Sequence, residues 1–187
     1  MDDQREVSPL RAALALESHR LEEDAMYTAR GHFEAARTWG RVHLLVGVPT
    51  ALIAAVAGVS AFNDHPTLAG SASIAVAALS SIGTFLNPSE RAQAHQLAGA
   101  RFNALRSQAR FLREVGLLTT RPDKDLTSAM EDLCSSRDQY NQESPSIPRP
   151  AFVRARKGIE EGEANYAVDQ KTASAPSALP PGPDRSN

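Results

Sequence analysis

Two adjacent stretches without charged residues decide the fold: VHLLVGVPTALIAAVAGVSAFN at 42–63 and HPTLAGSASIAVAALSSIGTFLNPS at 65–89. A hydrocarbon core of roughly 30 Å needs about 20 helical residues at about 1.5 Å each, and both stretches reach that length. Helix is the form expected in lipid, because a lone pair of strands would leave backbone N–H and C=O groups unpaired. The sequence therefore predicts a transmembrane helical hairpin over 42–88, with spans at about 42–63 and 67–87 and a turn at 63–66.

The alternative for these stretches is a pair of core helices in a soluble bundle. Ala, Gly and Ser dilute the apolar character of the second stretch, as they would in a soluble core. A helix packed at a domain surface shows charge on its outer side, however, and neither stretch has a charged face. The rest of the chain is rich in charged residues and offers too little apolar surface to bury both helices. The membrane hairpin is therefore the favoured interpretation, with the lipid bilayer as a partner.

The average composition hides this partition. The chain has 187 residues, 42% of them hydrophobic and 22% charged, and a net charge of −2, values typical of one soluble domain. All 20 Lys and Arg residues nevertheless lie outside 42–89. The slightly acidic balance and the aromatic content of 5% argue against nucleic acid as a partner. The single cysteine, Cys134, excludes an internal disulfide.

Basic residues near the spans predict their orientation. They precede the first span at Arg30, Arg37 and Arg41, and they follow the second at Arg91, Arg101 and Arg106. The connecting turn has neither Lys nor Arg, so the positive-inside rule predicts that both termini are cytoplasmic. We expect no cleavable signal peptide, because the first apolar run begins only at Val42.

Four side chains are suited to anchor the hairpin at the membrane interface: Arg37, Trp39, Arg41 and Arg91. An indole at the position of Trp39 fits the headgroup region. It fits a core role against a neighbouring helix equally well, and the sequence leaves both roles open.

An amphipathic cytoplasmic helix is predicted within residues 1–41. Ser8 and Pro9 mark its start, because serine is a favourable N-cap and proline is tolerated at the first helical position. Apolar and small residues then recur at helical spacings, at Leu10, Leu14, Leu21, Ala25, Thr28, His32, Ala36 and Trp39. This pattern predicts one helix that runs into the membrane.

Further cytoplasmic helices are predicted over residues 89–143. Pro88 and Ser89 open the first, whose apolar stripe is formed by Ala94, Leu97, Ala98, Phe102, Leu105, Ala109 and Leu112. A shorter helix begins at Asp123 or Asp125. We expect the helices before and after the hairpin to pack together as a cytoplasmic bundle, with further stripes buried between subunits. The fold class predicted is therefore all-α, a two-span hairpin continuous with an amphipathic bundle that oligomerises.

Proline marks the C-terminal part. Residues 144–170 are predicted to form a Pro-rich connector and a short charged helix from about Ala151 to Tyr166. Residues 171–187 contain four further prolines and are predicted to be a disordered tail.

No spacing predicts a catalytic, metal or cofactor site. The five histidines are scattered and have no ligand partners at a typical spacing: His19, His32, His43, His65 and His95. The acidic clusters at 22–24 and 160–161 are interpreted as solvated helix faces. No Gly-rich phosphate loop is present, because the glycines fall in the spans and at helix ends. We therefore expect neither an enzyme nor a bound cofactor.

Small and polar side chains form a stripe on each span. In the second span they are Ser73, Ala77, Ser80, Thr84 and Asn87, at spacings of four, three, four and three. The first span has a weaker counterpart in His43, Gly47, Thr50, Ala54 and Ala57. Such a stripe serves either close helix packing or the lining of a hydrated path between subunits, and the pattern alone favours packing.

Pro49 and Gly47 are candidate hinge residues in the first span. Proline at this position removes the hydrogen bond to the carbonyl of Leu45, which can kink the helix. The alternative is that a proline near the start of a membrane helix is simply tolerated.

The whole arrangement resembles the SLATT domain family, small bacterial proteins in which a two-helix membrane hairpin is embedded in cytoplasmic helices. The resemblance covers roughly Leu10 to Asp169. It is carried by LLVGVPTALIAAVAGVSAF (44–62), GTFLNPSERAQAH (83–95) and ARFNALRSQARFLR (100–113), and PSIPRPAFVRARKGIEEGEANYAVD (145–169) looks like the family's usual end.

The resemblance implies an effector of bacterial antiphage defence. Members are associated with SMODS nucleotidyltransferases or SLOG proteins and are proposed to form inner-membrane pores that kill or arrest an infected cell. On this basis we expect a homo-oligomer that responds to a nucleotide second messenger or to a signalling partner protein. The alternative function is a membrane-anchored helical scaffold or adaptor that conducts nothing.

Overall fold

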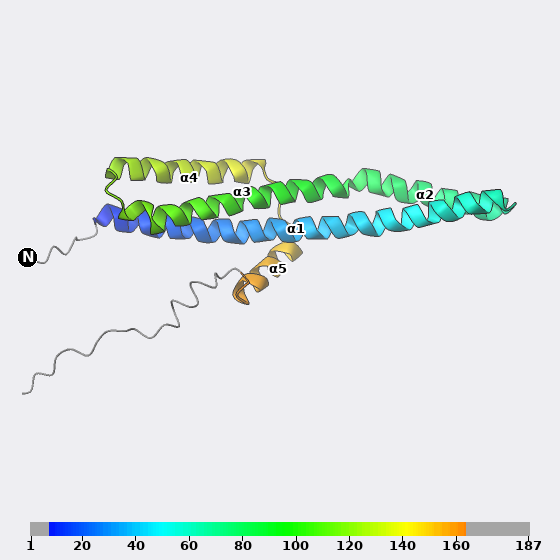
Figure 1. Ribbon diagram of the computed structural model, residues 1–187, viewed down its shortest axis with the longest axis horizontal. Helices are drawn as coiled ribbons and strands as arrows, with labels where there is room; N and C mark the ends of the chain where they lie inside the picture. Colours follow the sequence, from blue (N-terminus) through cyan, green and yellow to red (C-terminus); the bar gives the residue numbers. More distant parts are fainter. Residues whose placement is uncertain (1–7, 164–187) are drawn as a thin grey trace, which may run out of the picture.

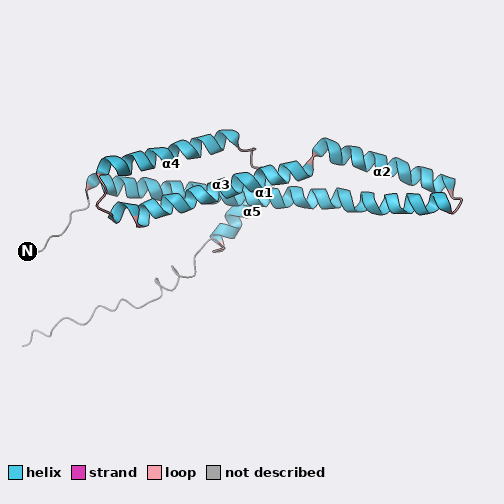
Figure 2. Ribbon diagram, turned by 45° about the horizontal axis from the view of Figure 1, so that its top comes forward, coloured by secondary structure: helices cyan, strands magenta, loops and turns pink. Residues whose placement is uncertain are grey.

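The computed structural model describes residues 8–163, which form an elongated all-α structure (Figure 1). The elements are α1 (Pro9–Phe62), α2 (Pro66–Leu86), α3 (Pro88–Glu114), the short 3₁₀ helix η1 (Gly116–Leu118), α4 (Asp123–Glu143) and α5 (Arg149–Glu160). α1 runs along the molecule, and α2 and α3 return beside it one after the other (Figures 1 and 2). The predicted all-α hairpin joined to a bundle is thus confirmed, and the predicted tail at 171–187 lies outside the described residues.

α1 joins the predicted cytoplasmic helix and the first span into one helix of 54 residues. At about 1.5 Å per residue it is about 80 Å long. It begins at Pro9, as the sequence predicts, although the Ser8 hydroxyl makes no capping hydrogen bond. The helix continues through Pro49 without a break.

A tight turn reverses the chain at the far end of α1. Asp64 adopts a positive φ of 54°, a conformation that aspartate tolerates better than most residues. Two helices of the described chain are long and apolar enough to cross a membrane, α1 and the helical run that begins with α2. Their most apolar windows are only 6% and 0% buried. No other described part of the chain covers these apolar surfaces.

A sharp break separates α2 from α3 at Asn87. Its φ of 42° and ψ of 55° lie in the left-handed region, which asparagine visits more readily than other non-glycine residues. Pro88 then occupies the first position of α3, where its missing N–H costs no hydrogen bond. The Asn87 side chain donates to the Glu90 carboxylate in the first turn of α3. The direction of the chain therefore changes where the hairpin meets the bundle.

The hydrophobic core lies in the helical bundle, between α1, α3 and α4. Its buried members are Leu14, Leu21, Ala25 and Ala29 from α1, Phe102, Leu105, Ala109 and Leu112 from α3, and Leu117, Leu126 and Met130 beyond them. α1 and α3 approach closely at Gly99, where an added Cβ would lie 2.7 Å from the Phe33 ring. The predicted packing of the helices before and after the hairpin is confirmed.

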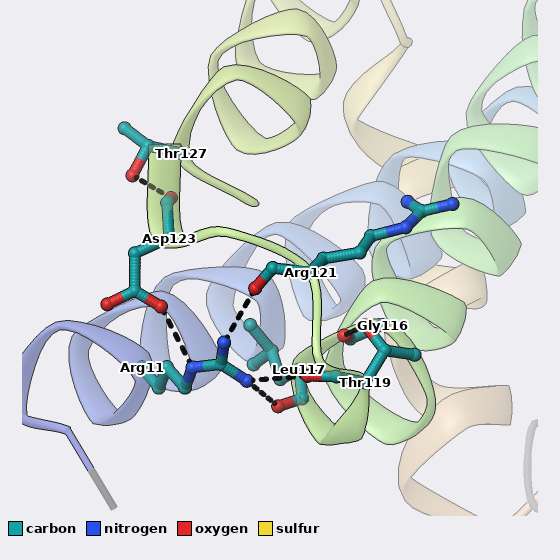
Figure 3. A network of polar contacts seen from close by, with 7 residues as sticks. All are labelled: Arg11, Gly116, Leu117, Thr119, Arg121, Asp123 and Thr127. Atoms are coloured by element: carbon teal, nitrogen blue, oxygen red, sulfur yellow. Dashed lines mark hydrogen bonds and ion pairs between the residues drawn. The ribbon is translucent and has the colours of Figure 1, made fainter. Parts of the chain in front are cut away.

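Arg11 stabilises the end of the bundle that is farthest from the hairpin (Figure 3). Its guanidinium donates to the backbone carbonyl oxygens of Leu117, Thr119 and Arg121 at 2.8 to 2.9 Å. It also pairs with the Asp123 carboxylate at 2.9 Å. One side chain at the start of α1 thereby holds the whole connection between α3 and α4.

α5 packs against α1, close to the hairpin (Figure 1). Ala151 and Ala155 are buried against the bundle, and Arg154 donates to the Thr38 hydroxyl at 2.8 Å. α5 begins at Arg149, two residues before the predicted start. The predicted end at Tyr166 lies outside the described residues.

Candidate functional site

Polar residues of both spans line one groove between α1 and α2, in the half of the hairpin nearest the bundle. This hairpin groove has a volume of 470 Å³. α1 contributes His43, Val46, Gly47, Thr50, Ala51 and Ala54, and α2 and the start of α3 contribute Leu79, Ser80, Gly83, Thr84, Asn87, Pro88 and Ser89. Thus the two stripes identified in the sequence meet along one groove that opens at the surface of the hairpin.

Some hydroxyl groups of the hairpin bond to the backbone, whereas others have no hydrogen-bond partner among the described residues. Thr50, Ser73 and Ser81 donate to backbone carbonyl oxygens one turn earlier, at 2.6 to 2.8 Å, as serine and threonine in helices commonly do. Within residues 8–163, the hydroxyls of Ser80 and Thr84 have no hydrogen-bond partner. They line the groove, so a water molecule or a polar group that enters it can satisfy them.

The outer half of the hairpin is packed by small side chains. Ala57, Ser60 and Ala72 are the buried residues there, and Ala57 was one of the predicted stripe members. Ser73 and Ala77 are exposed and lie outside the hairpin groove. Close packing therefore accounts for part of the two stripes, and groove lining accounts for the part nearest the bundle.

The predicted hinge residues lie in a continuous helix. Gly47 lines the groove, and a Cβ added there would meet nothing within 4 Å. Pro49 is half-buried, and α1 passes through it uninterrupted. The sharpest backbone break of the hairpin lies instead at Asn87. A hinge at Gly47 and Pro49 remains a prediction.

The predicted interface anchors gather where the hairpin enters the bundle. The Arg91 guanidinium lies 4.8 Å above the Trp39 ring, a cation–π contact between α3 and α1. Trp39 is half-buried beneath it, so it packs against α3 and still reaches the surface. Arg41 is exposed, and Arg37 pairs with Glu34 at 2.5 Å.

A buried histidine pair lies in the bundle below this junction. The Nδ1 atoms of His32 on α1 and His95 on α3 are 3.0 Å apart, and both side chains are almost fully buried. The His32 ring stacks on Phe102 with a centroid distance of 5.7 Å. An Nδ1 to Nδ1 hydrogen bond requires a proton on the Nδ1 of one ring, which donates, and an unprotonated Nδ1 on the other ring, which accepts.

Burial holds both rings of this pair neutral. It lowers the pKa of His32 to about 4, and the neighbouring His95 adds to the effect. Burial also lowers the pKa of His95. Sequence reasoning missed the pair because the two residues are 63 positions apart. The sequence does contain a signal that His95 is buried. His95 lies three residues before Ala98 and seven before Phe102, which places it on the apolar stripe of the helix.

A second, acidic cavity of 550 Å³ lies between α1, α4 and α5. Its charged lining residues are Glu23, Asp24, Asp138 and Arg137, and Arg137 is already bonded to Asp138 at 3.0 Å. This excess of carboxylates does not favour a phosphate ligand. Glu22, expected on a solvated face, instead pairs with Arg113 of α3 at 2.8 Å and is largely buried.

Comparison with family models, with curated proteins and with solved structures finds no match to this chain. Within residues 8–163, no three His, Cys, Asp or Glu side chains are grouped as a metal site requires. Function has to be inferred from the apolar hairpin, the groove within it and the resemblance in sequence.

Proposed function

We propose that this chain is a membrane-embedded, non-enzymatic effector whose copies assemble in the bacterial inner membrane. Assembly forms a pore or otherwise breaks the integrity of the membrane during antiphage defence, when a cytoplasmic signal is received. The observation that carries the proposal is the hairpin groove, where the hydroxyls of Ser80 and Thr84 line a surface between two helices of mainly apolar residues.

The exposure of the hairpin supports insertion into a bilayer. A core helix of a soluble protein is covered by its own chain, whereas the apolar windows here are almost wholly uncovered. Phe62 and Phe85, for example, are 91% and 88% exposed. Arg41 and Arg91 flank the two spans on the bundle side, which supports cytoplasmic termini. The resemblance to SLATT domain proteins supports the role in defence.

Oligomerisation is part of the proposal for a geometric reason. Two helices cannot enclose a channel, so a hydrated path needs hairpins from several copies. Hydroxyl groups that face such a path would replace part of the hydration shell of a passing ion or hold water in the path.

Ion flux from liposomes tests the pore directly. We expect the wild-type protein to release a trapped ion at a rate that rises with the protein-to-lipid ratio. Ser80→Leu with Thr84→Leu should lower that rate at least tenfold, because it replaces the two unpaired hydroxyls of the groove with bulky apolar side chains. Ser81→Leu is the matched control, since the Ser81 hydroxyl is already bonded to the carbonyl of Ala77.

The alternative function, a non-conducting scaffold, makes the opposite prediction. A scaffold gives no flux at any protein concentration, although it still resists extraction by carbonate. If Ser80→Leu with Thr84→Leu conducts as well as Ser81→Leu, the assignment of the groove as the path is wrong.

A further inference from the structure

α3 carries a second apolar stripe that nothing in the described chain covers. One face of the helix presents Leu97, Ala100, Ala104 and Phe111, with the polar but uncharged Gln108 between the last two, at spacings of three, four, four and three. All five are exposed, and Leu97 and Phe111 are exposed by 56% and 62%. The exposed Val115 and Leu118 follow at the end of the helix. The core of the bundle uses a different face of α3, through Phe102, Leu105 and Ala109.

Lipid does not account for the length of this stripe. At about 1.5 Å per residue, Phe111 lies about 36 Å along α3 from Asn87, where the apolar hairpin ends. The headgroup region beyond the hydrocarbon core is only about 5 to 8 Å thick on each side. The far half of the stripe is therefore in water in the absence of a protein partner, which is an unusual place for a row of uncovered apolar side chains.

The charges of α3 permit two identical stripes to meet. The stripe residues themselves are uncharged, and the charged residue that borders them between Leu97 and Ala104 is Arg101. Two of the basic side chains of α3 are bound within the bundle, because Arg101 pairs with Glu143 of α4 and Arg113 pairs with Glu22 of α1. Two copies that pack through this face bring no like charges together on it.

The size of the surface also fits a pair of chains. The exposed fractions of the four large apolar residues add up to more than two fully exposed residues. These four are Leu97, Phe111, Val115 and Leu118. Burying this surface on two copies removes on the order of 1,000 Å² in total, the size at which specific protein interfaces begin. The small Ala100 and Ala104 between the large residues allow two helix backbones to approach closely.

We infer that this face of α3 is the contact through which two copies of the chain associate. The inference rests on the proposed insertion into one membrane, because that fixes the direction of α3 to be the same in every copy. The two α3 helices then run parallel, with spacings of three and four residues that suit a parallel helix pair. Equivalent residues of the two copies face one another across the contact.

Cysteine cross-linking in native membranes tests this contact. In a Cys134→Ser background, Ala104→Cys should form a disulfide-linked species of twice the chain mass when oxidised. Asn103→Cys is the matched control, because it is the adjacent exposed position and lies off the stripe. We expect at least fivefold more cross-linked product at 104 than at 103.

A second measurement tests whether cross-linking at 104 depends on the contact along α3. Leu97→Glu with Phe111→Glu should abolish cross-linking at 104, because it places two like charges of each copy in the contact. Equal yields at 103 and 104, a product of another mass, or cross-linking that survives the two glutamates would overturn the inference.

Flux measured on the same preparations keeps the two proposals distinct. Cross-linking at 104 without ion flux contradicts the pore and leaves the α3 contact in place. Flux with no cross-linking preference for 104 contradicts the α3 contact and leaves the pore in place.

Discussion

Acidification should destabilise the helical bundle through the buried pair of His32 and His95. In the unfolded chain a histidine takes up a proton near pH 6.5, whereas burial lowers the pKa of folded His32 to about 4. Between these values the unfolded state binds more protons than the folded state. The contribution to stability is therefore fully present above pH 6.5 and is lost as the pH falls toward 4.

The size of the effect follows from the two pKa values. His32 alone accounts for a loss of about 1.4 kcal/mol at pH 5.5, with a limit of about 3 kcal/mol below pH 4. The lowered pKa of His95 acts in the same direction. Arg91, one turn from His95 on α3, already places positive charge nearby. For a chain of this size the loss at pH 5.5 corresponds to a melting temperature lower by about 3 to 6 °C.

Thermal unfolding of the detergent-solubilised protein, followed by circular dichroism, measures this loss between pH 7.5 and pH 5.5. His32→Leu with His95→Leu replaces both rings, so its melting temperature should fall much less over that range. His19→Leu removes an exposed histidine from the same helix and should keep the full wild-type drop. Equal drops in the wild type and in the double variant would refute the reasoning.

Two substitutions in the bundle test its packing. Arg11→Met keeps the aliphatic stem but removes four hydrogen bonds, so we expect a loss of about 2 to 3 kcal/mol in thermal unfolding. Arg20→Met is its control, since the exposed pair of Arg20 contributes little. Gly99→Ala should cost about 1 to 3 kcal/mol because its Cβ meets the Phe33 ring at 2.7 Å. Gly40→Ala, with nothing within 4 Å of its Cβ, should instead stabilise α1 slightly, and the opposite order of melting temperatures would contradict the helix crossing.

Most of the fold is encoded in local patterns. The helix starts at Pro9 and Pro88 follow from the residues at each site, and the turn after Phe62 follows from the polar cluster that interrupts two apolar runs. Helical periodicity places Leu21 and Phe102 on core faces, where the structure has them. These features depend on neighbours in sequence, which is why the sequence is sufficient to predict them.

The rest depends on contacts between distant segments. A proline inside a helix either bends the helix or is accommodated, and the packing of neighbouring segments decides between these outcomes. The presence of Pro49 in the sequence is therefore not enough to predict that α1 stays continuous. The pairing of His32 with His95 requires the register of α1 against α3, which periodicity does not supply. The open stripe on α3 was hidden for a similar reason. Helical periodicity alone groups Leu97 with core residues such as Ala98, and only the packed structure shows that Leu97 lies on another face.

In the proposed pore, the hairpin groove would account for only half of the path through a bilayer. On α1 its lining runs from His43 to Ala54, about 17 Å at about 1.5 Å per residue, against a hydrocarbon core of roughly 30 Å. Beyond it Ala57 and Ala72 are buried between the two helices, and the lining of the hairpin groove does not extend to the far side. Ser73, exposed on the outer half, lies outside this groove and is available to a neighbouring copy. A continuous path therefore needs more than one chain, and a contact along α3 would hold neighbouring hairpins side by side where their grooves begin.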